Sequence, residues 1–227
     1  MSPINKTARL AGFFYLMFLV TFIFASAVRS KLFAYGDATV TAQNILSSDG
    51  LFRLGFVSEI LSAVFFLLSA WALYTLLKPV NKNLALLFVF LNLGGVAVEC
   101  VSLLNQFAAL LLLSGADYLK VFQVEQLQSL SLIFLNLYKN GLMIAQIFYG
   151  VWLFPLGYLV FKSGFLPRIL GLVMMIHCVG WLLTFLQFFL FPSFTGITYL
   201  TYPLGFISEA GLTLWLLIMG VKDQKTA

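Results

Sequence analysis

Charged side chains are scarce in this sequence of 227 residues, because Asp, Glu, Lys and Arg together make up 9%. Soluble domains average about 25% charged residues, so the composition excludes an ordinary soluble domain. Hydrophobic residues make up 62% and the mean hydropathy is +1.02, which is typical of an integral membrane protein. The net charge of +5 comes from Lys and Arg residues that stand singly or in pairs. Without a basic run, binding of nucleic acid is not indicated.

Histidine and cysteine are equally scarce. The chain has one histidine, His177, and two cysteines, Cys100 and Cys178. Both cysteines lie in apolar runs, where a free thiol acts as a small hydrophobic side chain, so we expect packing roles for them. No Gly-x-Ser-x-Gly, phosphate-binding glycine loop or Cys-x-x-Cys occurs. These absences favour a protein that is not an enzyme and that carries no cofactor.

Six apolar runs are each long enough to cross a bilayer, which takes about 20 residues. They predict an all-α, polytopic membrane protein whose residues 1–227 form a single integral membrane domain. The first run follows Lys6 and Arg9 and could be mistaken for a signal peptide, but we expect it to be retained as a spanning helix. The predicted spans cover residues 8–28, 52–77, 84–113, 135–161, 167–189 and 203–221.

Basic residues mark one end of these spans. The connectors at residues 78–82 and 162–168 are short and basic, and they fall on the same side as both termini. The positive-inside rule therefore places both termini in the cytoplasm. The opposite connectors are longer and carry mixed charge. Asp37 or Thr39 is expected to start a short helix in the first of them, and Asp117 another in the second, because such residues cap helix N-termini.

Three of the eight acidic residues lie inside apolar runs, and each follows a glycine by four positions: Glu59, Glu99 and Glu209. Positions i and i+4 share one face of a helix, and glycine allows a neighbouring helix to approach closely. We therefore expect the three carboxyl groups to face protein rather than lipid. An ionisable group in hydrocarbon is costly enough to be a candidate functional group.

Other polar residues accompany these glutamates along the spans. Asn92, Glu99, Ser102 and Gln106 follow one another at spacings of three or four, which places them in one stripe of a helix. We predict that such stripes enclose one polar pocket within the membrane. Its predicted lining residues are Glu59, Glu99, Glu209, Lys139, Gln106, Gln146 and His177.

Three hypotheses for this pocket stay open, because several carboxylates in a dry volume must be relieved of their charge. In the preferred one, the protein binds or transports a small cationic or lipophilic ligand, or a proton, and Lys139 is the tunable partner of the glutamates. In the second, Lys139 and Arg53 neutralise glutamates, and the polar network only fixes packing in a structural subunit of a membrane complex or a homo-oligomer.

The third hypothesis is a metal-dependent intramembrane hydrolase. Carboxylates and imidazole suit zinc, manganese or iron, but one histidine and the lack of a His-x-x-x-His or Glu-x-x-His spacing give it little support. The residues that would serve as ligands are His177, Glu59, Glu99 and Glu209.

The sequence also contains an internal repeat. Residues 54–59 read LGFVSE and residues 204–209 read LGFISE, while RLAG at residues 9–12 recurs more weakly as RILG at residues 168–171. Both hairpins would start on the cytoplasmic side. They predict a parallel repeat, in which helices 1 and 2 correspond to helices 5 and 6.

Three segments resemble a bacterial family of membrane proteins, the domain of unknown function 4386. They are ARLAGFFYL at residues 8–16, SGFLPRILG at 163–171, and the stretch from Glu209 through Trp215 to Lys222. The resemblance spans nearly the whole chain, and it implies a multi-helix fold in the bacterial cytoplasmic (inner) membrane, without an activity. Such proteins carry a histidine near the start of the fourth helix, where this chain has residues 137–140, LYKN. That departure argues against a shared metal role for this helix.

Overall fold

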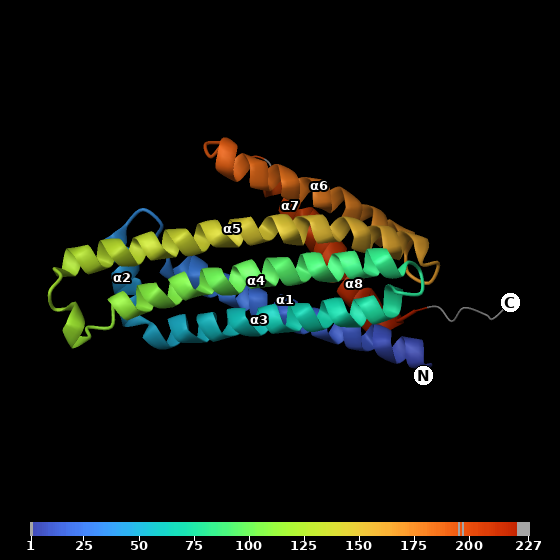
Figure 1. Cartoon of the computed structure of the whole chain (residues 1–227), viewed down its shortest axis with the longest axis horizontal. Coiled ribbons are helices and arrows are strands. Elements are labelled where there is room, and N and C mark those ends of the chain that lie inside the picture. Colours follow the sequence, from blue (N-terminus) through green and yellow to red (C-terminus); the bar gives the residue numbers. More distant parts are fainter. Residues whose placement is uncertain (1, 195, 197, 222–227) are drawn as a thin grey trace. The chain divides into compact units, whose positions relative to one another are not determined.

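The computed structural model describes residues 2–194, 196 and 198–221, and within them the chain is helical, with no strand (Figure 1). Six helical segments are long and apolar enough to span a membrane, which confirms the predicted number. Their bounds are Pro3–Leu32, Asp49–Leu77, Lys82–Leu112, Val124–Lys162, Arg168–Leu190 and Tyr199–Met219.

The first five spans are the helices α1 (Pro3–Leu32), α3 (Asp49–Leu77), α4 (Lys82–Leu112), α5 (Val124–Lys162) and α6 (Arg168–Leu190). Several extend beyond the apolar runs, and α5 begins well before residue 135, where the run starts. Backbone hydrogen bonding continues through polar residues, whereas an apolar run marks only the part of a helix suited to hydrocarbon.

The two connectors opposite the termini contain helical structure near the predicted starts. Asp37 caps α2 (Ala38–Ser47), because its carboxylate accepts a hydrogen bond of 2.9 Å from the backbone N–H of Val40. This confirms the helix start expected at Asp37. At Asp117 the chain forms only a 3₁₀ turn, η1 (Asp117–Leu119), before α5 begins.

The sixth span is irregular. It passes from α7 (Thr198–Gly205) into the π-helical turn η2 (Phe206–Ala210), then through α8 (Gly211–Leu214) into a second π turn, η3 (Trp215–Met219). Pro203 lies inside α7 and has no N–H to donate. Glu209 thus lies in a π turn, whereas Glu59 lies in the regular helix α3. Because the two copies of the repeated sequence differ in backbone, the internal repeat stays a prediction.

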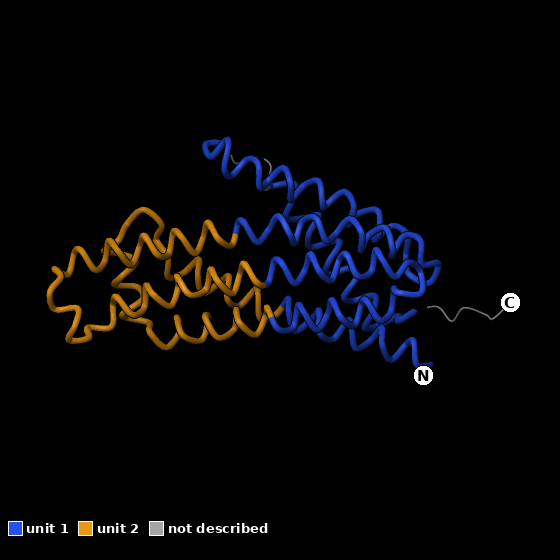
Figure 2. The backbone as a smooth tube through the Cα atoms, viewed as in Figure 1, with its two compact units in different colours: residues 1–19, 64–96, 143–227 blue, residues 20–63, 97–142 orange. Residues whose placement is uncertain are grey.

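The chain divides into two compact units (Figure 2). Unit 1 comprises residues 1–19, 64–96 and 143–227, and unit 2 comprises residues 20–63 and 97–142. The boundaries fall inside α1, α3, α4 and α5. The single-domain organisation of residues 1–227 stays a prediction.

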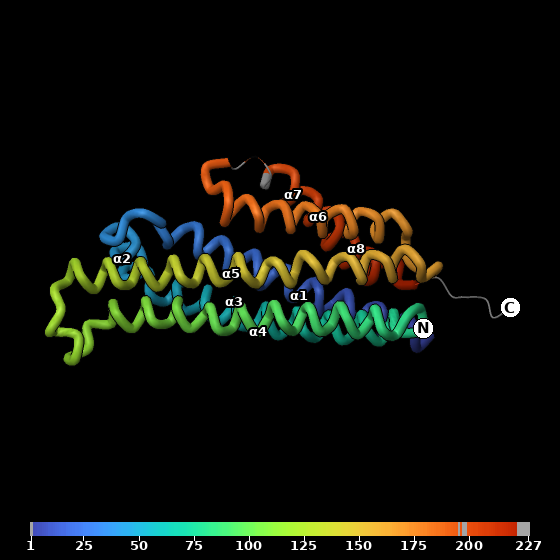
Figure 3. Tube along the Cα trace, turned by 45° about the horizontal axis from the view of Figure 1, so that its top comes forward, coloured from blue at the N-terminus to red at the C-terminus, as the bar shows by residue number. Residues whose placement is uncertain are grey.

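In unit 1, α7 packs against α6, as Figures 1 and 3 both show. The connector between α5 and α6 is ordered by its own sequence. The Ser163 hydroxyl accepts a hydrogen bond of 3.1 Å from the Leu166 N–H, and Gly164 adopts a φ of +73°, which favours glycine. Phe165 and Leu166 are buried. This connector and Trp215 line a shallow pocket, so two of the segments that carry the family resemblance meet in unit 1.

In unit 2, apolar side chains from α1 to α5 form one core around Tyr138, which is fully buried. Other members of this core are Val28, Leu32, Phe33, Ile45, Phe52, Leu103, Ala109, Leu110 and Leu135. The hydroxyl of Tyr138 therefore needs a buried polar partner, and the partner is one of the predicted glutamates.

Candidate functional site

The predicted pocket residues are divided between the two units. Gln146, His177 and Glu209 belong to unit 1. Glu59, Glu99, Gln106 and Lys139 belong to unit 2. A single pocket that they all line would need both units and stays a prediction.

All three intramembrane glutamates are withdrawn from the surface. The residues Glu59 and Glu99 are 1% and 5% exposed, and the side chain of Glu209 is 19% exposed. A Cβ atom added at Gly55 would lie 2.7 Å from Val28 of α1, and one added at Gly205 would lie 2.8 Å from the His177 ring of α6. The close approach of neighbouring helices at these glycines is therefore confirmed, and so is the protein-facing placement of the glutamates.

In unit 2, Glu59 has a dedicated counter-ion. Nη1 of Arg29, on α1, lies 2.6 Å from Oε2 of Glu59, and the hydroxyl of Tyr138 on α5 donates a hydrogen bond to Oε1. The Arg29 guanidinium also lies 5.8 Å from the ring centroid of Phe22 and 5.9 Å from that of Tyr138, within cation–π range. A charged partner of opposite sign thus neutralises Glu59.

The sequence missed this partner and named two other basic residues. Arg53 pairs with Asp49 at 2.8 Å, one helical turn away at the surface. The Lys139 ammonium lies 4.7 Å from the ring centroid of Tyr35, in the connector after α1. Partial burial raises the pKa of Tyr35 to about 12, so the ring facing Lys139 is neutral at physiological pH. Arg29 ends the first apolar run, and this position was its only signal in the sequence.

The predicted polar stripe of α4 does face protein. Its members are 0–5% exposed: Asn92, Glu99, Ser102 and Gln106. In unit 2, Ser102 packs directly against Gly141 of α5. The Oε1 atom of Gln106 is buried and has no hydrogen-bond partner in the part of the chain that the structure describes.

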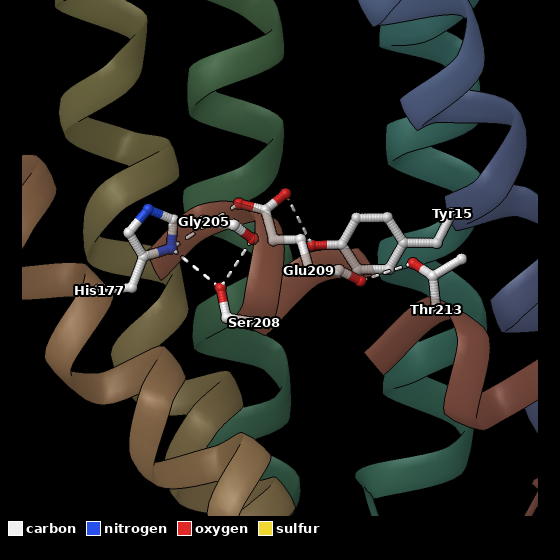
Figure 4. A network of polar contacts seen from close by, with 6 residues as sticks. All are labelled: Tyr15, His177, Gly205, Ser208, Glu209 and Thr213. Carbon is white, nitrogen blue, oxygen red and sulfur yellow. Dashed lines mark hydrogen bonds and ion pairs between the residues drawn. The ribbon is translucent and has the colours of Figure 1, made fainter. Parts of the chain in front are cut away.

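In unit 1, Glu209 is the centre of a polar network that joins α1, η2 and α6 (Figure 4). The hydroxyl of Tyr15 on α1 donates a hydrogen bond of 3.2 Å to Oε2 of Glu209. Nδ1 of His177 on α6 lies 3.9 Å from Oε1 of Glu209 and 3.1 Å from the hydroxyl of Ser208. The sequence named Glu209 and His177 but missed Tyr15 and Ser208, because only the fold brings them together.

Side-chain hydroxyls stabilise the π turn that carries this network. The Ser208 hydroxyl donates to the carbonyl of Gly205 at 3.1 Å, and the Thr213 hydroxyl donates to the carbonyl of Glu209 at 2.7 Å. Such bonds satisfy carbonyls in a segment whose helical pattern is interrupted. π turns inside α-helices occur frequently at functional sites.

Comparison with known proteins places the chain in a family. The family model described as Domain of unknown function (DUF4386) matches residues 10–220. The chain belongs to this family. An uncharacterized protein of Archaeoglobus fulgidus is 28% identical to it over 153 residues, which cover 67% of this chain and 75% of the relative. No solved structure matches the chain.

The family match confirms the resemblance seen in the sequence, and with the six apolar helices it makes this DUF4386 chain a multi-pass membrane protein in contact with a lipid bilayer. Neither the family nor the relative is named for an activity.

The two glutamates of the repeated sequence differ in charge balance. Both accept a hydrogen bond from a tyrosine hydroxyl, Tyr138 for Glu59 and Tyr15 for Glu209. Glu59 also pairs with a guanidinium, which is always protonated. Among the described residues, the one basic group in ion-pair range of Glu209 is the imidazole of His177, which can be neutral or charged. The charge at Glu209 is therefore variable.

The remaining predicted residues add little to this centre. Gln146 lies on α5 in unit 1 and is partly buried. Within the described residues, no three His, Cys, Asp or Glu side chains are placed to share a metal ion. The alternative metal set of His177, Glu59, Glu99 and Glu209 gains no support from the geometry.

Proposed function

We propose that this DUF4386 protein binds a small cation inside the membrane at the carboxylate of Glu209 and moves it across the bilayer. The supporting observation is the contrast between Glu209 and Glu59. An intramembrane carboxylate with a guanidinium beside it is neutralised permanently, whereas one whose neighbour is a single imidazole has room for an added positive charge.

The packing hypothesis fits the other unit better. In unit 2, Glu59 forms an ion pair with Arg29 and accepts a hydrogen bond from Tyr138, as expected of polar residues that hold helices together. We assign that cluster a structural role and the Glu209 network the functional one. The preferred partner is accordingly a cation or proton in unit 1, and a homo-oligomer is not needed for this site.

Removing the charge of Glu209 tests the proposal. In vesicles with an imposed membrane potential, the native protein should take up tetraethylammonium, which bare bilayers largely exclude, or should admit protons read by an enclosed pH dye. Glu209→Gln should lower the rate at least about tenfold, because an amide offers the cation no charge, and Glu209→Asp should retain part of it. Glu125→Gln, which removes an exposed carboxylate at the start of α5, is the matched control.

Two results of the flux measurement would contradict the proposal. Equal rates in native protein and Glu209→Gln, or no flux of either ion with native protein, would overturn the proposal. The thermal midpoint of each variant in detergent shows whether a lost rate reflects lost folding.

We further propose that the protein lies in the bacterial cytoplasmic (inner) membrane, as the family resemblance implies, with both termini in the cytoplasm, as the basic connectors indicate. In a background with Cys100 and Cys178 replaced by serine, Asp117→Cys should react with an impermeant maleimide added to intact cells, because Asp117 is 92% exposed. Asn83→Cys, at the start of α4, should react only after permeabilisation. The reverse pattern would invert the topology.

A further inference from the structure

The two ring nitrogens of His177 have different surroundings. Nδ1 contacts the Ser208 hydroxyl, and that hydroxyl donates its single hydrogen to the carbonyl of Gly205. With that hydrogen on the carbonyl, the Ser208 oxygen accepts from Nδ1–H, and on this ground we assign the hydrogen of the neutral ring to Nδ1. The nearby carboxylate of Glu209 favours the same tautomer, because the N–H dipole then points toward negative charge (Figure 4).

Nε2 consequently presents a lone pair, and nothing in the described residues donates to it. His177 is fully buried, and Nε2 has no hydrogen-bond partner there. Gly205 lies against this edge of the ring, where a Cβ atom would come within 3.0 Å of Nε2. A buried acceptor without a donor is destabilising, so this arrangement needs a reason beyond packing.

We propose that the cation bound at this site is a proton, that Nε2 of His177 is the atom that takes it up, and that the Glu209 carboxylate facing Nδ1 balances its charge. This inference rests on the function proposed above and names its ion. A proton from water forms an N–H bond at the Nε2 lone pair and converts the ring to imidazolium. The imidazolium then faces the Glu209 carboxylate at 3.9 Å, so the protonated pair has no net charge. Loss of the same proton restores the neutral ring.

The side chains packed around His177 and Glu209 leave these two residues as the charged pair of the site. From η2 the ring meets Ser208 and Glu209, and from α1 Tyr15 bonds the far oxygen of Glu209. The ring of Trp181, one turn along α6, lies 5.7 Å from the imidazole between centroids and is tilted by 42° to it, and Trp181 in turn contacts Tyr202 of α7 and Gly150 of α5. Among these described neighbours, Glu209 supplies the negative charge. Tyr15 holds that carboxylate in place and is a positioning residue.

The chain's one histidine makes the test direct. Protein labelled with ¹⁵N in histidine, and freed of any polyhistidine tag, gives imidazole resonances that belong to His177 alone. Their positions distinguish the Nδ1–H tautomer, the Nε2–H tautomer and the imidazolium. We expect the Nδ1–H tautomer in alkaline solution and the imidazolium after acidification. Ser208→Ala should raise the share of the Nε2–H tautomer, because Nδ1–H loses its acceptor.

Coupling to Glu209 is the decisive observation. In Glu209→Gln, the proton concentration at which half of the rings are protonated should be at least about tenfold higher, because the facing negative charge is gone. In the control Glu125→Gln, this concentration should equal that of the native protein. An Nε2–H tautomer in native protein, or a titration that Glu209→Gln leaves unchanged, would overturn this inference, and the vesicle assay would still decide whether another cation is carried. Coupling without any Glu209-dependent flux would keep the uptake of a proton by His177 and overturn its transport.

Discussion

Replacing Arg29 by methionine should destabilise the folded protein by about 3–5 kcal/mol, the loss measured when one partner of a buried ion pair is removed. Methionine keeps much of the side-chain volume but removes the positive charge beside Glu59, a residue 1% exposed. The Glu59 carboxylate then keeps the hydrogen bond from the Tyr138 hydroxyl. Denaturant unfolding in detergent micelles, followed by tryptophan fluorescence, would measure the change.

A double variant separates the two sources of that loss. Because an apolar pair of similar volume is often as stable as a buried ion pair, Arg29→Met combined with Glu59→Leu should recover most of the stability that Arg29→Met loses. The matched control is Arg53→Met, since Arg53 and Asp49 form an exposed pair with side chains 59% and 48% accessible. Such pairs contribute about 0–1 kcal/mol. An equal loss in both arginine variants would show that Arg29 does not compensate a buried charge.

The membrane fold could be predicted from the sequence because one property dominates it. Apolar runs of about 20 residues have few alternatives to a spanning helix, and the six runs became six helices. Helix ends were harder to predict from the sequence. The helix α5 continues from its apolar run back to Val124 through polar residues that hydropathy does not assign to a span. The π turns of the sixth span have no signal in residue type, and the sequence placed Pro203 at the start of that span, whereas it lies inside α7.

The candidate site was predictable in its carboxylates and in His177, but not in the other partners of the glutamates. A glycine four residues before each glutamate indicated close packing on one face, and the structure confirms it at Gly55 and Gly205. Partners depend on which helices are neighbours and on their relative heights, which local spacing does not encode. Thus Arg29 and Tyr15, both on α1, were missed, whereas the pairing of Arg53 with Asp49 follows from the i,i+4 rule.

The two LGFxSE segments show how one motif can be used in two ways. In each, the glycine packs against the preceding helix of its hairpin and the glutamate accepts a tyrosine hydroxyl. What differs is the basic partner of the glutamate, which is a guanidinium in unit 2 and an imidazole in unit 1. The chemical consequence is large, because a guanidinium is always charged, whereas an imidazole can be neutral or charged.

Replacing Gly171 by alanine should reduce stability by about 3 kcal/mol, the upper end for overpacking. A Cβ atom at this position would lie 2.6 Å from the backbone N and 3.0 Å from the Cα of Phe161 on α5, and closer still to the carbonyl oxygen of Gly157. These are backbone atoms, so they cannot rotate away as a side chain would. The helices must separate, and the packing of α6 on α5 is lost.

Gly50→Ala is the matched control, because it lies in α3 with no atom within 4 Å of an added Cβ. There the higher helix propensity of alanine should leave stability unchanged or raise it by up to about 1 kcal/mol. The Gly171 variant should also alter the ¹⁵N signals of His177, which lies farther along the displaced helix α6 and depends on its height relative to η2 for the contact with Glu209. If Gly171→Ala and the native protein unfolded at the same denaturant concentration, α5 and α6 would not cross at Gly157 and Gly171. The placement of His177 would then lose its structural basis.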